Sequence, residues 1–170
     1  AQFNLQQFVN SKAGHFKHLK FPGIDDVDTT RLLTYPAFFA DKQGDLFMKM
    51  RFGYSANGKM LFARYDGNQW HGYDEFNSTN ASEQGSDYNW GLYGDLKYVN
   101  GKLRVGFVKR MSNNGDAYVY NNGWHYAYTN DPNGKNQWYN YKNQPLSLPI
   151  INPAGLFFYE PASEVQSNGA

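Results

Sequence analysis

The amino-acid sequence predicts an all-β protein whose strands form consecutive antiparallel sheets. Aromatic residues make up 18% of the 170 residues, and charged residues only another 18%, a composition that disfavours intrinsic disorder. The 17 glycines, together with many asparagines, supply the turns that many short strands require. Apolar residues occur in short alternating runs and rarely keep a helical spacing. We therefore expect several short strands and no long helix.

Nine strands are expected from these runs, and turn residues separate most of them. Their ranges are 35–40, 45–51, 59–65, 94–99, 102–109, 117–120, 124–129, 137–141 and 155–159. Tight turns are expected at 42–45, 99–102 and 121–123, because Gly or Asn there tolerates a positive φ. Strands joined in this way form antiparallel meanders.

The strands also repeat as a group, which predicts a β-propeller of four-stranded antiparallel blades. Residues 40–51 align with residues 98–110, and each copy reads as a glycine turn, a strand and an arginine. A blade takes about 40 to 50 residues plus loops, so residues 1–170, read as part of one domain, correspond to about three blades. Closed propellers have about four to eight blades. We expect a larger ring, completed by a missing segment or a companion chain. A self-contained β-sandwich with a coincidental repeat is the alternative.

Two local patterns add to this prediction. The segment 129–138 reads as a degenerate Asp-box, in which Asp131 caps a hairpin turn and Trp138 packs behind it. Glycosylation sequons at Asn77 and Asn80 indicate a surface loop.

Charge and residue usage exclude several classes of function. A net charge of +1 is too small to suggest a nucleic-acid-binding protein, and the sequence contains no apolar run long enough for a membrane span. The chain has no cysteine, so disulfides and thiolate metal sites are excluded. Neither a close histidine pair nor a calcium-loop spacing is present, so no metal site is predicted, although a structural metal ion stays open.

Several segments together resemble the branch of the BNR-repeat superfamily that contains the ulvan lyases, which act on glucuronate-containing polysaccharides. The matching stretches are 14–19, 34–36, 51–58, 93–104, 138–139 and 145–149. This resemblance implies a seven-bladed propeller enzyme, secreted or periplasmic, that cleaves a sulfated anionic polysaccharide, with ulvan the expected substrate, by β-elimination and without a required cofactor. Two alternatives stay open: a glycoside hydrolase acting on rhamnose-glucuronate linkages, and a non-catalytic carbohydrate-binding propeller.

The resemblance also implies three catalytic residues, His15, Tyr93 and Arg110. Elimination needs a base for the C5 proton, an acid for the leaving oxygen and a cation for the uronate carboxylate. His15 matches the catalytic histidine and lies in a segment rich in lysine. Arg110 ends the second repeated strand, where a guanidinium suits a carboxylate. Tyr93 is expected on the preceding strand as acid or base.

A second group of residues is expected to contact the substrate. His18 follows His15, Arg51 is the repeat equivalent of Arg110, and Lys109 precedes Arg110 in a basic stretch. Asn57 is expected to offer hydrogen bonds to sugar hydroxyls, and Tyr128 a ring on which a sugar stacks. The sequence assigns no role to His71 and His125.

Overall fold

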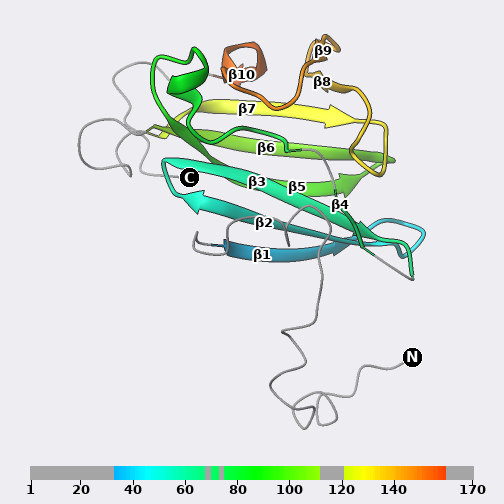
Figure 1. Cartoon of the computed structure of the whole chain (residues 1–170). Coiled ribbons are helices and arrows are strands. Elements are labelled where there is room, and N and C mark those ends of the chain that lie inside the picture. Colours follow the sequence, from blue (N-terminus) through cyan, green and yellow to red (C-terminus); the bar gives the residue numbers. More distant parts are fainter. Residues whose placement is uncertain (1–32, 68–69, 73–74, 112–120, 160–170) are drawn as a thin grey trace, which may run out of the picture.

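The computed structural model of the protein describes residues 33–67, 70–72, 75–111 and 121–159, which form two antiparallel sheets (Figure 1). The first sheet contains, in spatial order, β1 (Leu33–Ala40), β2 (Leu46–Tyr54), β3 (Asn57–Tyr65) and β4 (Trp70–Gly72). The second contains β5 (Trp90–Val99), β6 (Lys102–Met111), β7 (Asn121–Thr129), β8 (Trp138–Asn140) and β9 (Pro145–Leu146), and β10 (Phe157–Tyr159) also pairs with β7.

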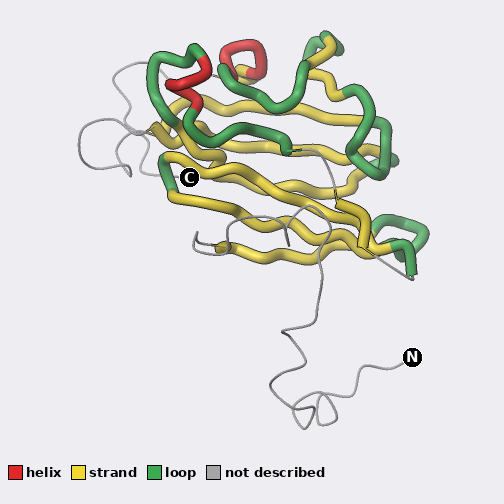
Figure 2. The backbone as a smooth tube through the Cα atoms, viewed as in Figure 1, coloured by secondary structure: helices red, strands yellow, loops and turns green. Residues whose placement is uncertain are grey.

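The predicted all-β class is confirmed, and so are the antiparallel blades. β1 to β4 form a four-stranded sheet, and β5 to β8 form a second four-stranded meander, which β9 and β10 extend to six strands. From β1 to β4 and from β5 to β9, strands that follow one another in the chain are hydrogen-bonded neighbours. The helical turns in the described residues are two short 3₁₀ segments, η2 (Ala81–Gln84) and η3 (Pro153–Leu156) (Figure 2). No helix of the described part is long and apolar enough to cross a membrane. The predicted strand at 117–120 lies outside the described residues.

The internal repeat corresponds to one sheet followed by the next. The β1–β2 hairpin turns at Gly44, with φ of 89°, and the β5–β6 hairpin turns at Asn100 and Gly101, with φ of 50° and 75°. Positive φ is inexpensive for Gly and tolerable for Asn, so these residues suit tight turns. β1 to β4 therefore correspond to β5 to β8, each set forming one blade.

The main hydrophobic core lies between the two sheets. Phe47 and Phe62 project from the first sheet, and Phe107 and Trp138 from the second, all nearly or fully buried. Phe62 meets Trp138 edge to face with ring centroids 6.0 Å apart, and Phe76 contacts both Phe107 and Trp138 in the same way. Each such ring contributes about 1.5 to 3 kcal/mol through burial. The core thus fixes how the sheets face each other.

Alternation along β6 decides which side chains face that core. Leu103, Val105 and Phe107 are buried against the first sheet, whereas Gly106 between them is exposed. Because successive side chains on a strand point to opposite faces, Arg104 and Arg110 belong to the other face of the second sheet.

The predicted Asp-box turn between β7 and β8 is confirmed. The Asp131 carboxylate accepts hydrogen bonds from the backbone N–H groups of Asn133, Lys135 and Asn136 at 2.9 to 3.0 Å. Trp138 is fully buried and donates its indole N–H to the carbonyl of Gly134 at 2.9 Å. The motif is a structural clamp on the hairpin.

The turn expected at 121–123 is wrong, because these residues begin β7. The pairing of β6 with β7 shifts register between Val108 and Lys109, and Gly123 has a φ of 65°. A positive-φ glycine within a strand is typical of a bulge, which absorbs one extra residue without ending the strand. The side chain of Phe157 packs on Gly123, since a Cβ there would lie 2.2 Å from the Phe157 ring.

The prediction of a surface loop from the two sequons is also wrong for the first of them, Asn77. Asn77 is fully buried. Its side-chain oxygen accepts the backbone N–H of Met60 at 2.9 Å, and its amide nitrogen donates to the carbonyl of Gly58 at the same distance. A side-chain amide has the hydrogen-bonding groups of a peptide unit. Asn77 therefore completes the edge of β3 and is not accessible.

Candidate active site

A groove of about 380 Å³ lies where β5 of the second sheet meets the first sheet. It receives side chains from four strands, which combine two cations, an acid and two phenol rings with apolar walls. The lining residues are Tyr35, Lys49, Met50, Arg51, Met60, Leu92, Tyr93, Gly94 and Asp95. A concave site with a few converging polar groups is the usual form of a ligand pocket.

Tyr93 lines this groove, and Arg110, which is not itself a lining residue, lies directly beside Tyr93. Tyr93 pairs with Val108 in the β5–β6 ladder, two residues from Arg110, so both side chains lie on the same face of the sheet. The Arg110 guanidinium carbon lies 4.0 Å from the centroid of the Tyr93 ring. Tyr93 is 38% exposed and Arg110 only 5%. The ring therefore faces solvent, with the cation behind it.

Arg110 is held by hydrogen bonds as well as by this ring. Its Nε donates to the side-chain oxygen of Asn121 at 2.8 Å, and one terminal nitrogen donates to the hydroxyl of Ser55 at 3.0 Å. Asn121 belongs to the same sheet, whereas Ser55 lies at the β2–β3 turn of the other sheet. A charge in such a poorly solvated position acts more strongly on its neighbours than one in water.

Arg51 reaches the same groove from the first sheet. Its Nε donates to the hydroxyl of Thr34 at 3.1 Å, and its guanidinium carbon lies 4.8 Å from the centroid of the Tyr35 ring. The β1–β2 register shifts between Thr34 and Ala37, and Tyr35 has a φ of 55°. An irregularity of this kind re-aims a side chain. The predicted equivalence of Arg51 and Arg110 thus extends to an aromatic ring beside each guanidinium.

Lys49 and Asp95 form an ion pair across the two sheets. Lys49 also donates to the carbonyl of Gly94 at 3.0 Å, and Lys97 lies 3.3 Å from the same carboxylate. Burial alone would raise the pKa of Asp95. The hydrogen bonds and charges of Lys49 and Lys97 together outweigh burial and hold that pKa below its ordinary value. Asp95 therefore carries its negative charge at neutral pH.

The predicted substrate residue Lys109 lies on the opposite face of β6 from Arg110. It is buried, and its ammonium group donates to the hydroxyl of Tyr88 at 2.7 Å. The ammonium also lies 5.8 Å from the centroid of the Phe157 ring. Lys109 does not line the groove, so a substrate contact at this residue finds no support in the structure.

The two other predicted contacts within the described residues, Asn57 and Tyr128, also lie outside the groove lining. Both ends of the Asn57 side-chain amide bond to Asn80, at 2.8 and 2.7 Å. Tyr128 is buried and donates its hydroxyl to Asn143 at 2.6 Å, while Lys102 lies 4.1 Å from its ring centroid. Their roles in binding sugar therefore stay predictions without geometric support.

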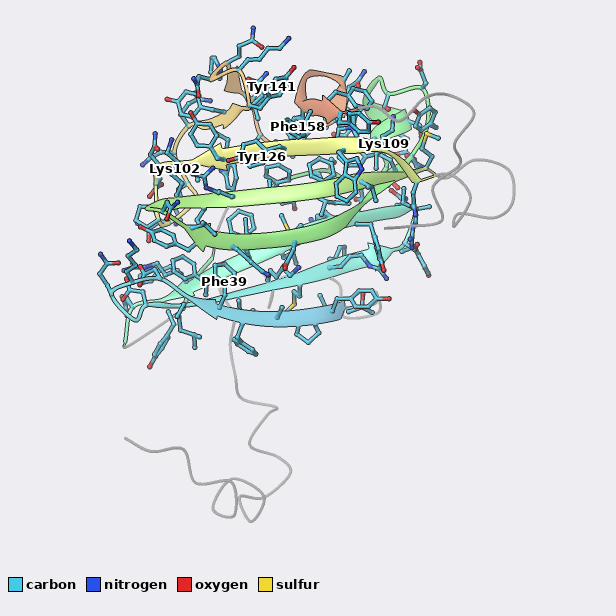
Figure 3. All side chains as sticks on the ribbon, turned by 180° about the vertical axis from the view of Figure 1, so that it is seen from behind. Phe39, Lys102, Lys109, Tyr126, Tyr141 and Phe158 are labelled. Carbon is cyan, nitrogen blue, oxygen red and sulfur yellow. The ribbon has the colours of Figure 1, made fainter. Side chains whose placement is uncertain are left out.

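Tyr128 instead lines a second groove, also of about 380 Å³, on the second sheet. Its other lining residues are Lys102, Arg104, Tyr126, Tyr141, Asn143 and Phe158. Figure 3 labels Lys102, Tyr126, Tyr141 and Phe158 over β6, β7 and the segments beyond them, with Phe39 on the first sheet. This face of the second sheet is the repeat equivalent of the first-sheet face that packs in the core. It is consequently the face on which a further blade would pack.

Two of the four histidines, His71 and His125, lie within the described residues. His15 and His18 lie outside the described part of the chain. His125 is buried between the rings of Phe107 and Phe157, with centroids 4.9 and 4.4 Å away, while His71 pairs with Asp66. Within the described ranges, no group of three or more histidine or acidic side chains is placed to hold a metal ion.

Sequence reasoning missed Lys49 and Asp95, although a signal for each was present. Lys49 precedes Arg51 by two residues, and Asp95 follows Tyr93 by two residues. Residues two apart on a strand share a face. Arg51 and Tyr93 therefore each indicated one further site residue on the same strand, Lys49 and Asp95 respectively.

Comparisons with known proteins identify the family. Residues 9–168 match the model of a protein family whose description is "BNR repeat-containing family member". The chain is 40% identical over 179 residues to the ulvan lyase, long isoform, of Alteromonas sp. (strain LOR). This alignment covers 100% of the present chain and 18% of that relative. The chain is 38% identical over 173 residues to the ulvan lyase, short isoform, of the same strain, covering 96% of this chain and 33% of the relative.

A solved structure agrees with the sequence comparison. The crystal structure of polysaccharide lyase Uly1 matches with a TM-score of 0.69 and 38% sequence identity, over 75% of this chain and 27% of that one. The chain thus spans between about a fifth and a third of the length of these relatives. The family match extends over nearly the whole chain, and the protein belongs to the BNR repeat-containing family.

Proposed function

We propose that the protein is a polysaccharide lyase that cleaves a uronate-containing sulfated polysaccharide, ulvan, by β-elimination. The relatives named above as ulvan lyases, and the structural likeness to a polysaccharide lyase, support the reaction class. The observation that carries the proposal is the juxtaposition of Tyr93 and Arg110 beside a groove lined by two further cations, Lys49 and Arg51.

The chemistry assigns a task to each of these groups. A base removes the C5 proton of the uronate, and the C–H electron pair forms the C4–C5 double bond. The C4–O bond then breaks, and an acid protonates the departing oxygen. The hydroxyl of Tyr93 serves as acid or base at the groove. The cation of Arg110 stabilises the negative charge that develops at the uronate carboxylate.

The groove is suited to a polyanion on one side and to a sugar on the other. Arg51 and Lys49 supply positive charge next to the apolar surface of Met50, Met60 and Leu92. Charged groups of this sign attract an anionic polymer and raise its local concentration. We assign Arg51 to a subsite for a carboxylate or sulfate, where a guanidinium forms paired hydrogen bonds. His15 as base and His18 as its neighbour stay assignments from the sequence.

We infer that the two described blades belong to a larger ring, because the chain matches about a fifth of the length of the long-isoform relatives. The enzyme would act outside the cytoplasm, in secreted or periplasmic form, where polysaccharides of this size are available. The elimination as written requires no cofactor.

The products of ulvan treatment test this function directly. The full-length protein should release oligosaccharides that carry an unsaturated uronate, detected by the ultraviolet absorbance of its double bond and by mass spectrometry. A neutral polysaccharide without uronate serves as the matched substrate control and should give no signal. Release of sugars without the double bond would indicate a hydrolase, and binding without release would indicate a carbohydrate-binding propeller. Either result would contradict the lyase assignment.

A further inference from the structure

Arg110 occupies the middle of a three-strand ladder in which both neighbours are small or polar. Gly91 of β5 lies opposite Arg110 on one side, and Asn121 of β7 lies opposite it on the other. Residues that are directly opposite in an antiparallel ladder share a face of the sheet. Asn121 is 6% exposed, and its side-chain oxygen accepts the Nε hydrogen of Arg110 at 2.8 Å. One edge of the guanidinium is therefore fixed from within the second sheet.

The second contact comes from the other sheet. Ser55 lies in the tight turn between β2 and β3, and its hydroxyl accepts a hydrogen bond from a terminal nitrogen of Arg110 at 3.0 Å. The turn approaches so closely because Gly91 has no side chain. A Cβ at Gly91 would lie 2.2 Å from the carbonyl oxygen of Ser55. The missing side chain thus provides the space through which one sheet contacts the arginine of the other.

These contacts act on different parts of one side chain. Asn121 accepts a hydrogen bond from Nε, and Ser55 accepts one from a terminal nitrogen. The ring of Tyr93 covers one face of the guanidinium plane. A free arginine side chain samples many rotamers, and ordering it at the moment of binding costs free energy. A charge that is already oriented stabilises a developing charge without reorganisation during the reaction.

We propose that Ser55 and Asn121 are positioning residues, which orient the Arg110 guanidinium for the uronate, and that Gly91 is glycine to admit Ser55. This inference rests on the proposed lyase function. It makes correct juxtaposition of two neighbouring blades a condition for activity, because Ser55 and Arg110 come from different sheets.

Substitutions at Ser55 test the proposal in the full-length protein. Ser55→Ala removes the hydroxyl, whereas Ser55→Thr keeps an oxygen at the same position and is the conservative control. A lost hydrogen bond to a charged group corresponds to about a tenfold effect or more. We expect Ser55→Ala to lower kcat for unsaturated product by about tenfold with a smaller change in KM, and Ser55→Thr to recover most of the rate. Asn121→Ala should lower kcat in the same way.

A double variant separates positioning from a general loss of stability. In an Arg110→Lys background, Ser55→Ala should change kcat by less than about twofold, because residues that act through one another are not additive. Equal losses with and without Arg110 would overturn the proposal, as would an unchanged kcat for Ser55→Ala in an active enzyme. A wild-type protein that forms no unsaturated product would instead overturn the proposed function, and a wild-type assay run in parallel distinguishes the two failures.

Discussion

The guanidinium carbon of Arg110 lies 4.0 Å from the centroid of the Tyr93 ring, although the two residues come from different strands of the second sheet. This distance is typical of a cation–π contact. The exposed ring and the buried cation form one unit at the edge of the groove. Substitutions in this unit and around it can separate the atoms that act in catalysis from those that only stabilise the fold.

The hydroxyl of Tyr93 can be separated from its ring by Tyr93→Phe. The substitution keeps the ring over Arg110 and removes only the group proposed as acid or base. Loss of a general acid or base typically lowers the rate by about 10²- to 10⁴-fold. We expect kcat to fall within this range while the melting temperature stays close to that of the wild type. Tyr54→Phe, at a tyrosine that is 66% exposed, is the matched control and should be neutral. An active Tyr93→Phe variant would exclude the hydroxyl from the reaction.

The Lys49–Asp95 ion pair should set the charge that an anionic substrate meets. Asp95 carries a negative charge within a groove proposed to bind a polyanion, so Asp95→Asn should lower KM for ulvan by about threefold or more at low ionic strength. Lys49→Met replaces this cation with an uncharged side chain of similar length and should raise KM. Both effects should shrink as salt is added, since screening weakens exposed charges. Steady-state kinetics over a salt series measures both effects. A higher KM for Asp95→Asn, or a lower KM for Lys49→Met, would contradict the assignment of this groove to a polyanion.

The buried His125 should make the protein less stable in mild acid. Burial, and then the charge of Lys109, lower the pKa of His125 from 6.5 to about 4, despite hydrogen bonds that act in the other direction. Between these values the unfolded chain binds a proton that the folded protein does not. The free energy of unfolding therefore falls as the pH drops below about 6.5, and the loss is complete below about 4.

The size of this effect follows from the pKa shift, at about 1.4 kcal/mol for each unit, or roughly 3 kcal/mol in total. His125→Phe keeps a ring between Phe107 and Phe157 and cannot titrate. Denaturant unfolding of the full-length protein over this pH range should give a smaller slope for the variant than for the wild type. Equal slopes would mean that folding does not lower the pKa of His125.

The Asp131 turn should be structural and not catalytic. Asp131→Ala leaves three backbone N–H groups without their carboxylate partner, and we expect a loss of about 2 kcal/mol or more in the free energy of unfolding. Asp131→Asn keeps one acceptor oxygen and should lose less. For both variants kcat/KM, measured well below the melting temperature, should remain that of the wild type. A large loss of kcat/KM without a loss of stability would assign this turn a catalytic role.

Local sequence signals predicted most of the fold. The glycine turns at Gly44 and Gly101 and the alternating runs around them predicted the two central hairpins, because turn chemistry and strand periodicity are local. The short strands β4 and β9 were missed, since two or three residues carry no period. The segment at 121–123 was misread, because the same Asn and Gly residues that form turns also form bulges within strands.

The site was harder to predict because it depends on how the sheets meet. Tyr93 and Arg110 share one face of neighbouring strands, and alternation within one sheet accounts for their proximity. The same alternation places Lys109 with Phe107 on the buried face, so its assignment to the substrate beside Arg110 neglected a rule that the sequence already contained. The approach of Ser55 to Arg110 follows from packing between sheets, which no local pattern encodes.

The rate at which Arg110→Lys forms unsaturated uronate from ulvan shows whether the guanidinium of Arg110 acts in the elimination. Lysine keeps the positive charge but lacks the planar fork that contacts Asn121, Ser55 and a carboxylate. Arg104→Lys, at an arginine on the same face of β6, is the matched control. We expect kcat/KM to fall by about 10² or more for Arg110→Lys and to stay close to wild type for Arg104→Lys, with both variants folded. An Arg110→Lys enzyme as active as the wild type would exclude a specific role for the Arg110 guanidinium in the elimination.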